Sequence, residues 1–220
     1  MDRGRWIGAL AASAIVALVL ILGVTAPTSH QRSFATTDTL GPDGGEDIAT
    51  YLGRARESLA ERSASDGDLW ALVSFHDQIR SDEIRGVVGD VRVSELRYRL
   101  QLDRVQTPVV DVQVADGDAA LAAADGHAIS KVQQLAGFDQ RQDAIHEAMV
   151  RGLNEQCACI VGVIVRGTVD ELEEIANQAQ VRAVEALPPD AIHGWFAVRP
   201  LLPEYVDVAV VGPDDGDVPR

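Results

Sequence analysis

The chain has 220 residues and a formal net charge of −15, from 34 acidic and 19 basic side chains. This length allows one core with appendages or two small domains. Because a surface with such an excess of carboxylates repels phosphate backbones, the composition argues against nucleic-acid binding. The sequence contains no phosphate-binding loop, dinucleotide fingerprint or serine-hydrolase elbow, which argues against the common nucleotide-dependent and hydrolytic enzymes.

The first apolar stretch, residues 6–24, contains no charged side chain. As a helix it would be about 28 Å long, close to the thickness of the hydrocarbon core of a bilayer. Arg3 and Arg5 precede it and acidic residues dominate after it. We therefore expect residues 1–26 to form a cytoplasmic stub and a single-pass transmembrane helix in the cell membrane, with the C-terminal part extracytoplasmic. A cleaved signal peptide is the alternative, because residues 24–26 resemble a small-residue cleavage site.

Residues 27–45 are rich in Pro, Ser, Thr, Gly and Asp and have no apolar period, which is typical of a flexible stalk. Apolar residues then recur at three- and four-residue spacing over 46–62, which predicts an amphipathic helix. We expect an extracytoplasmic α+β domain over 46–211, followed by a disordered acidic tail over 212–220.

Residues 157–187 predict a strand, a capped helix and a second strand. The first strand is a short β-branched run at 160–165, which is typical of a strand buried on both faces. Thr168 and Glu171 have the spacing of a capping box, so a helix should begin there. The returning strand is expected at 181–187, which completes a βαβ unit.

A looser copy of this unit lies earlier in the chain. Residues 69–75 supply its first strand, residues 84–88 an apolar helix face, and residues 91–100 the returning strand. Two such units are what a ferredoxin-like sheet with both helices on one face requires. The sequence therefore predicts a duplicated, ferredoxin-like α+β fold.

The segments around these two units have patterns of their own. Residues 107–114 predict an extra strand, paired with the strand at 91–100. Residues 116–154 predict a helical insertion between the units. Valines alternate over 206–210, which predicts a final strand.

Three motifs resemble a known group of proteins: WALVSF at 70–75, VIVRG at 163–167 and RPLLPE at 199–204. Together with the apolar amino terminus and the acidic stalk, they are similar to uncharacterised single-pass membrane proteins of high-GC actinobacteria. This resemblance implies no activity, so it assigns no catalytic or binding residue.

Cys157 and Cys159 are the only cysteines, and they would lie in an oxidising compartment. On a strand their Cα atoms would be about 6.6 Å apart, at the outer limit for a disulfide. Two interpretations stay open: a reducible bridge with a redox role, or two small apolar thiols at the entrance of a strand.

Two metal signatures begin in the sequence, but both are incomplete. His146 and Glu147 resemble the start of a zinc-protease helix, but Val150 occupies the place of the second histidine. The acidic run that begins at Asp116 lacks the glycine and the final glutamate of an EF-hand loop. We therefore expect no bound metal or cofactor, and a protein that is not an enzyme.

Trp195, Phe196, Arg199 and Tyr205 cluster in one segment bounded by prolines. Trp, Tyr and Arg are the residue types that anchor protein interfaces, so these four are candidates for contact with a partner. The alternative is a lid that closes the edge of the core.

These patterns favour a membrane-anchored binding or scaffold module that interacts with another envelope protein or with itself. The alternative is a thiol-based redox sensor that uses Cys157 and Cys159, or a ligand sensor at the open face of the sheet.

Overall fold

The computed structural model describes residues 38–219. The predicted membrane span at 6–24 and residues 27–37 of the predicted stalk lie outside this part of the chain. Between residues 38 and 219, no helix is both long enough and apolar enough to cross a membrane.

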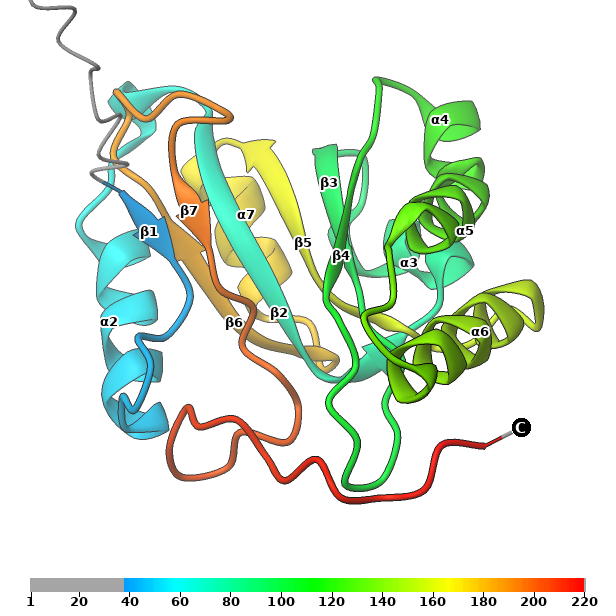
Figure 1. The fold of residues 1–220 in the computed structure, drawn as a ribbon. Helices are drawn as coiled ribbons and strands as arrows, with labels where there is room; N and C mark the ends of the chain where they lie inside the picture. The colour runs from blue at the N-terminus through cyan, green and yellow to red at the C-terminus, as the bar shows by residue number, and fades with distance from the viewer. Residues whose placement is uncertain (1–37, 220) are drawn as a thin grey trace, which may run out of the picture. The chain divides into compact units, whose positions relative to one another are not determined.

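A five-stranded antiparallel sheet with the strand order β4-β3-β5-β2-β6 organises the domain (Figure 1). The predicted strands at 69–75 and 160–165 are neighbours at its centre, where Leu69 lies opposite Gly167 and Ser74 opposite Gly162. The mixed α+β class is therefore confirmed. The five strands are β2 (Leu69–Ile79), β3 (Arg92–Tyr98), β4 (Val110–Gln113), β5 (Ile160–Gly167) and β6 (Val181–Ala186).

Two helices connect strands that are not neighbours in the sheet. Helix α3 (Ile84–Val88) joins β2 to β3 and leaves β5 between them, whereas α7 (Val169–Ala176) joins β5 to β6 and leaves β2 between them. The predicted capping box of α7 is confirmed, because Thr168 and Glu171 exchange both of its hydrogen bonds.

The main core lies on the face of the sheet that carries both connecting helices. Alternate side chains of β2, including Val73 and Phe75, pack there with Ile84 of α3 and Leu172 of α7. These side chains are fully buried. The run of β-branched residues in β5 is buried on both faces, as its sequence predicts.

The predicted helical insertion is confirmed as three helices that continue this core beyond β4 (Figure 1). Their buried residues include Val132 and Met149, which belong to the same cluster as Val112 of β4. The strand predicted at 107–114 is also confirmed, because β4 pairs with β3. The three helices are α4 (Asp118–Ala122), α5 (Ala124–Gln134) and α6 (Gln140–Asn154).

The opposite face of the sheet is covered by segments from both ends of the described chain. Strand β1 (Thr39–Leu40) pairs in parallel with β7 (Ala197–Val198), and the side chain of Leu40 packs on Leu72 and Ile164. Helix α2 (Ile48–Ala60), which the sequence predicts, packs along β6 at the edge of the sheet.

Two boundary predictions are wrong. Residues 38–45 are part of the domain and not of a flexible stalk, because Leu40 is fully buried and the Gly41 N–H donates to Glu185. Residues 212–219 are not a disordered tail, because Asp214 and Asp215 accept hydrogen bonds from arginine side chains of the domain.

The predicted final strand at 206–210 is also wrong. Its backbone bonds to the start of α2 instead of to the sheet: the Ile48 N–H donates to the Asp207 carbonyl, and the Ala209 N–H donates to the Glu46 carbonyl. The Ala209 side chain is buried in a cluster with Ile48 and Tyr51 of α2, whereas the alternating valines are exposed. They become surface residues rather than core residues.

Candidate functional site

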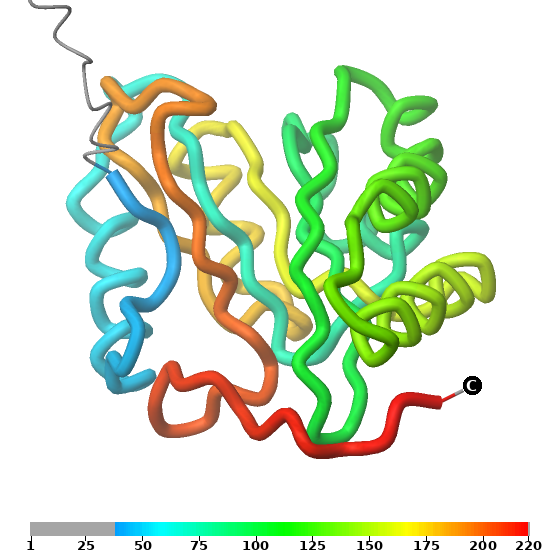
Figure 2. The backbone as a smooth tube through the Cα atoms, viewed as in Figure 1, coloured from blue at the N-terminus to red at the C-terminus, as the bar shows by residue number. Residues whose placement is uncertain are grey.

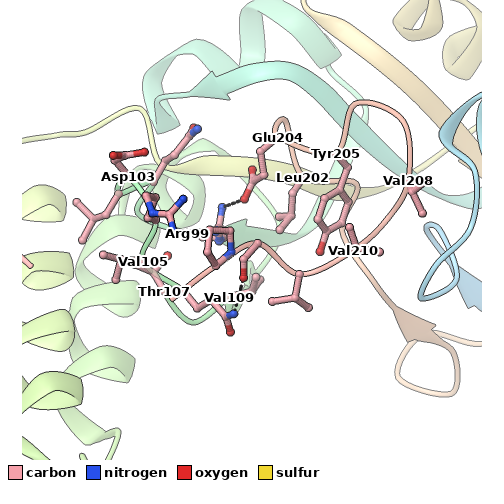
Figure 3. A pocket seen from close by; sticks show the side chains of 17 residues that line it. Arg99, Asp103, Val105, Thr107, Val109, Leu202, Glu204, Tyr205, Val208 and Val210 are labelled. Atoms are coloured by element: carbon pink, nitrogen blue, oxygen red, sulfur yellow. Dashed lines mark hydrogen bonds and ion pairs between the residues drawn. The ribbon is translucent and has the colours of Figure 1, made fainter. Parts of the chain in front are cut away.

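A cleft of about 690 Å³ lies between the β3–β4 loop at 99–109 and the C-terminal segment at 202–213 (Figure 3). Its volume falls within the range of small-molecule and peptide pockets. In Figure 2 the red C-terminal segment runs beneath the turn of this loop. The cleft is therefore built from two segments that lie about 100 residues apart in the sequence.

Local backbone chemistry shapes the loop side of the cleft. Leu102 and Val105 form an isolated bridge, and Arg104 between them adopts the left-handed conformation with φ of 52°. The Thr107 hydroxyl donates to the Leu100 carbonyl at 2.5 Å and so closes the base of the loop. The loop is thus held as a tight hairpin-like turn.

Charged side chains fasten the C-terminal segment to this loop. The Arg104 guanidinium donates to both carboxylate oxygens of Asp215, at 2.7 and 2.5 Å. Asp214 accepts from the Gln106 N–H at 3.0 Å and from Arg141 of α6 at 2.9 Å. The hydrogen bond from Arg141 is the main reason why the pKa of Asp214 is lowered.

The polar centre of the cleft is an ion pair between Arg99 and Glu204 at 2.5 Å, drawn in Figure 3. The Arg99 side chain is 10% exposed and that of Glu204 is 32% exposed, so the pair is partly withdrawn from water. Beside it, burial raises the pKa of Tyr205. These groups could orient a ligand by donating and accepting hydrogen bonds.

The rim of the cleft is apolar and exposed. Val208 and Val210 line it, together with Val211, which is 69% exposed. Val206, also exposed, precedes them on the same segment. Single exposed valines are ordinary, but several along one segment beside a cleft are typical of an interaction surface. The alternation of these valines is visible in the sequence, but it predicts a final strand and not an exposed surface beside a cleft.

The four aromatic and arginine residues predicted as one interface do not line a single site. Only Tyr205 lines the cleft. Phe196 packs against Trp70, with ring centroids 6.2 Å apart, and so helps to close the core as the lid interpretation expected. Arg199 forms an ion pair with Asp43, whereas Trp195 is exposed on the β6–β7 loop.

Cys157 and Cys159 form a disulfide between the end of α6 and the start of β5. The spacing predicted for a strand does not apply, because β5 begins only at Ile160 and the chain turns at Ala158, between the two cysteines. This turn brings the two Cα atoms to 5.3 Å. Cys159 is buried in the main core and Cys157 is partly buried beside it.

Two buried polar groups on the β1–β7 side of the sheet were missed from the sequence. Glu185 of β6 accepts from the Gly41 N–H at 2.6 Å and from the Tyr51 hydroxyl at 3.2 Å, and it forms an ion pair with Arg54. Burial is the largest influence on this carboxyl and raises its pKa. The pattern of β6 placed Glu185 in a strand but gave no sign of its partners.

The second group is an ion pair between Glu95 and Arg97 of β3. Glu95 also accepts from Gln113 of β4 at 2.5 Å. Residues two apart on a strand share a face, so this pairing could have been predicted.

Within residues 38–219, no cluster of histidine, cysteine and acidic residues could hold a metal ion.

No protein-family model, no curated protein and no solved structure matches this chain. The assignment of a function therefore rests on the cleft and on the fold that carries it.

Proposed function

We propose that this protein is a non-enzymatic, membrane-anchored module that binds a protein partner of the cell envelope, or a second copy of itself, through the cleft. The observation that carries the proposal is the row of exposed valines at 206–211 beside the cleft. Such a surface loses contact with water when a partner covers it, and this burial supplies the driving force for association.

The fold assigned in this proposal is ferredoxin-like. The four strands of the two βαβ units have the order β6-β2-β5-β3, with all neighbours antiparallel, which supports that assignment. Strand β4 and helices α4 to α6 are then an addition at one edge. The apolar residues 6–24, with arginines before them and acids after them, support the anchor and an extracytoplasmic domain.

The cleft also defines the chemistry of the partner. A partner segment that places apolar side chains against Val208 and Val210 would bring its own backbone near Arg99 and Glu204, which can donate and accept hydrogen bonds. Because the protein is strongly acidic, a neutral or basic partner would approach faster than an acidic one.

The test compares Val210→Asp with Leu135→Asp in the full-length protein in its native membrane. Both positions are exposed and apolar, but Leu135, at the end of α5, does not line the cleft. After crosslinking, quantitative mass spectrometry should show that Val210→Asp loses at least about tenfold of the crosslinked partner or self-dimer, as a charge buried in an apolar contact requires. Equal crosslinking of wild type and both variants would contradict the proposal.

The disulfide supports a second candidate function, a thiol-based redox sensor. Cys157 is only partly buried, so a thiolate could attack its sulfur from the surface. Differential alkylation of the protein taken from cells should then reveal a reduced fraction that grows when the envelope becomes more reducing. If the disulfide stays fully oxidised under all these conditions, it is a structural crosslink and the redox-sensor function is contradicted.

A further inference from the structure

The loop between β6 and β7 presents two large apolar side chains to solvent. Ile192 is 62% exposed and Trp195 is 55% exposed. The backbone N–H of Trp195 donates to the backbone carbonyl of Ile192 at 3.0 Å, so these two residues are the ends of one tight turn. Gly194 within this turn has φ of +81°. This turn holds both side chains at one corner of the domain.

Aromatic packing supports the turn from beneath. The ring of His193, inside the turn, lies 4.7 Å from the ring of Trp70, and Phe196 packs against the same indole. The Arg166 guanidinium lies 5.4 Å from the Trp70 ring. The turn that presents Ile192 and Trp195 is therefore held in place by packed side chains beneath it.

The chain enters the domain beside this turn. The Ala197 N–H donates to the Asp38 carbonyl at 3.0 Å. The first described residue, Asp38, is therefore hydrogen-bonded to a residue that follows Trp195 by two positions. Residues 25–37 are all that separates Asp38 from the proposed span at 6–24. A segment of this length reaches at most about 45 Å when fully extended. If the anchor is inserted, the turn therefore remains within reach of the bilayer surface.

We infer that the turn from Ile192 to Trp195 docks on the surface of the lipid bilayer. This inference rests on the membrane anchor of the proposed function. Tryptophan favours the interface between headgroups and acyl chains, because its ring is apolar and its N–H is polar, and isoleucine favours the acyl region. Two such side chains bind weakly alone, but a short tether raises their effective concentration at the membrane to the millimolar range.

The charge of the protein indicates which lipid headgroups the turn would bind. The chain carries a net charge of −15, and Asp190 beside the turn is exposed. Because anionic headgroups repel such a surface, the turn fits a zwitterionic surface such as phosphatidylcholine better than a strongly anionic one.

Docking at this turn would direct the binding cleft away from the membrane. Trp70 and Arg92 lie in the same row of the sheet, since both are opposite Arg166. Arg99 of the cleft follows Arg92 by seven residues along the chain, which corresponds to roughly 20 Å. Figure 2 shows the β6–β7 loop, in orange, and the red C-terminal segment at opposite ends of the domain. The cleft would then face partners in the extracytoplasmic space.

The test uses the full-length protein in phosphatidylcholine vesicles whose acyl chains carry bromine near the headgroups. The difference in fluorescence between wild type and Trp195→Phe isolates the emission of Trp195. Bromine should quench this emission at least twofold, and Ile192→Asp should abolish the quenching. As a control, Phe138→Trp in the Trp195→Phe background places a tryptophan at an exposed position between α5 and α6, which should be quenched only by an aqueous quencher.

Flotation of the same vesicles separates two kinds of failure. If the protein does not float with the lipid, the anchor is absent, and both the proposed function and the docking are overturned. If it floats but Trp195 is quenched only from the aqueous side, like the Phe138→Trp reporter, the docking is overturned while the anchor stands. Protection of Trp195 from the aqueous quencher without any quenching by the brominated lipid would show a protein contact instead and would also overturn the docking.

Discussion

Gly41 shows how a single residue fixes the entry of the chain into the domain. Its φ is +95°, a conformation that side chains with a Cβ rarely adopt, and a Cβ built there would lie 1.6 Å from the Arg199 carbonyl oxygen. The glycine therefore allows β1 to approach the segment after β7, where the Arg199 N–H donates to the Leu40 carbonyl at 2.8 Å.

We expect Gly41→Ala to lower the free energy of unfolding by at least about 2 kcal/mol, through the clash and the strained backbone. Gly44→Ala is the matched control, because nothing lies within 4 Å of a Cβ at that position and its φ is not positive. Urea denaturation measures both. Equal stability of the two variants would show that β1 can move away at little cost.

Glu185 gives the domain a pH dependence at the residue scale. Burial raises the pKa of this carboxyl above its ordinary value of 4.5. A raised pKa in the folded state means that the stabilisation is complete below the unfolded-state pKa and is lost as the pH rises through the folded-state pKa. The ionised carboxylate remains tolerated, because Gly41, Tyr51 and Arg54 surround it.

We therefore expect the free energy of unfolding to contain a component that declines as the pH rises from 4.5 upward, and Glu185→Gln should remove it. Glu57→Gln, at an exposed position on α2, should retain it. Urea denaturation of the three proteins between about pH 4 and 8 makes the comparison. Parallel pH profiles for wild type and Glu185→Gln would contradict this role of the carboxyl.

At the scale of elements, α2 protects the outer edge of the sheet. An exposed edge strand is a template for unwanted pairing, and covering it with a helix removes that hazard. The contact includes a hydrogen bond between the backbone of β6 and a side chain of α2, since the Ala186 N–H donates to the Ser58 hydroxyl at 2.9 Å. Ser58 is the only serine of α2, so a single substitution removes this hydrogen bond.

Ser58→Ala should lower the free energy of unfolding by about 1–3 kcal/mol, because it leaves a buried N–H without an acceptor. Ser130→Ala is the control: its hydroxyl donates only to the Gly126 carbonyl of its own helix, at an exposed position, and its loss should cost under about 0.5 kcal/mol. Amide hydrogen exchange should also be faster at Ala186 in Ser58→Ala alone. Unchanged exchange there would mean that another group replaces the serine.

The elements that sequence patterns predicted are those with local signals. Strand β5 and the start of α7 follow from a β-branched run and from the spacing of Thr168 and Glu171, all within a few residues. Strand β1 has no such signal, because Leu40 stands alone among polar residues and its partner β7 lies more than 150 positions later. Long-range pairing of this kind leaves no period in the sequence.

The cleft could not be predicted for the same reason. Its two walls come from separate parts of the chain, and no motif in either wall signals a binding site. The alternation of Val206, Val208 and Val210 shows that they share a side but not whether that side faces the core. The side that faces inward is that of Ala209, which is buried in a cluster with Ile48 and Tyr51 of α2, and no sequence pattern encodes this long-range packing.

At the scale of the whole molecule, the C-terminal segment acts as a strap that joins the β3–β4 loop to α6. Its contacts include exposed ion pairs, whose strength depends on salt. Trypsin cleaves after arginine, and Arg104 is held by Asp215 at the turn of the loop. The cleavage rate there reports on the strap.

We expect the double substitution Asp214→Asn with Asp215→Asn to raise tryptic cleavage after Arg104 severalfold at low salt. About 1 M sodium chloride should raise the cleavage of the wild type toward the same rate, because screening weakens the ion pairs. Asp217→Asn, further along the segment and also exposed, is the control and should behave like the wild type. A cleavage rate that does not respond to either change would show that the loop is rigid by itself.

The pairing of β1 with β7 also sets how the domain would respond to mechanical force. A pull on the chain from its amino-terminal side reaches the Ala197–Asp38 and Arg199–Leu40 hydrogen bonds first, and then the bond from Gly41 to Glu185. These few hydrogen bonds would break before the force reached the five-stranded sheet. The outer β1–β7 layer would therefore unfold first, while the central sheet stays intact.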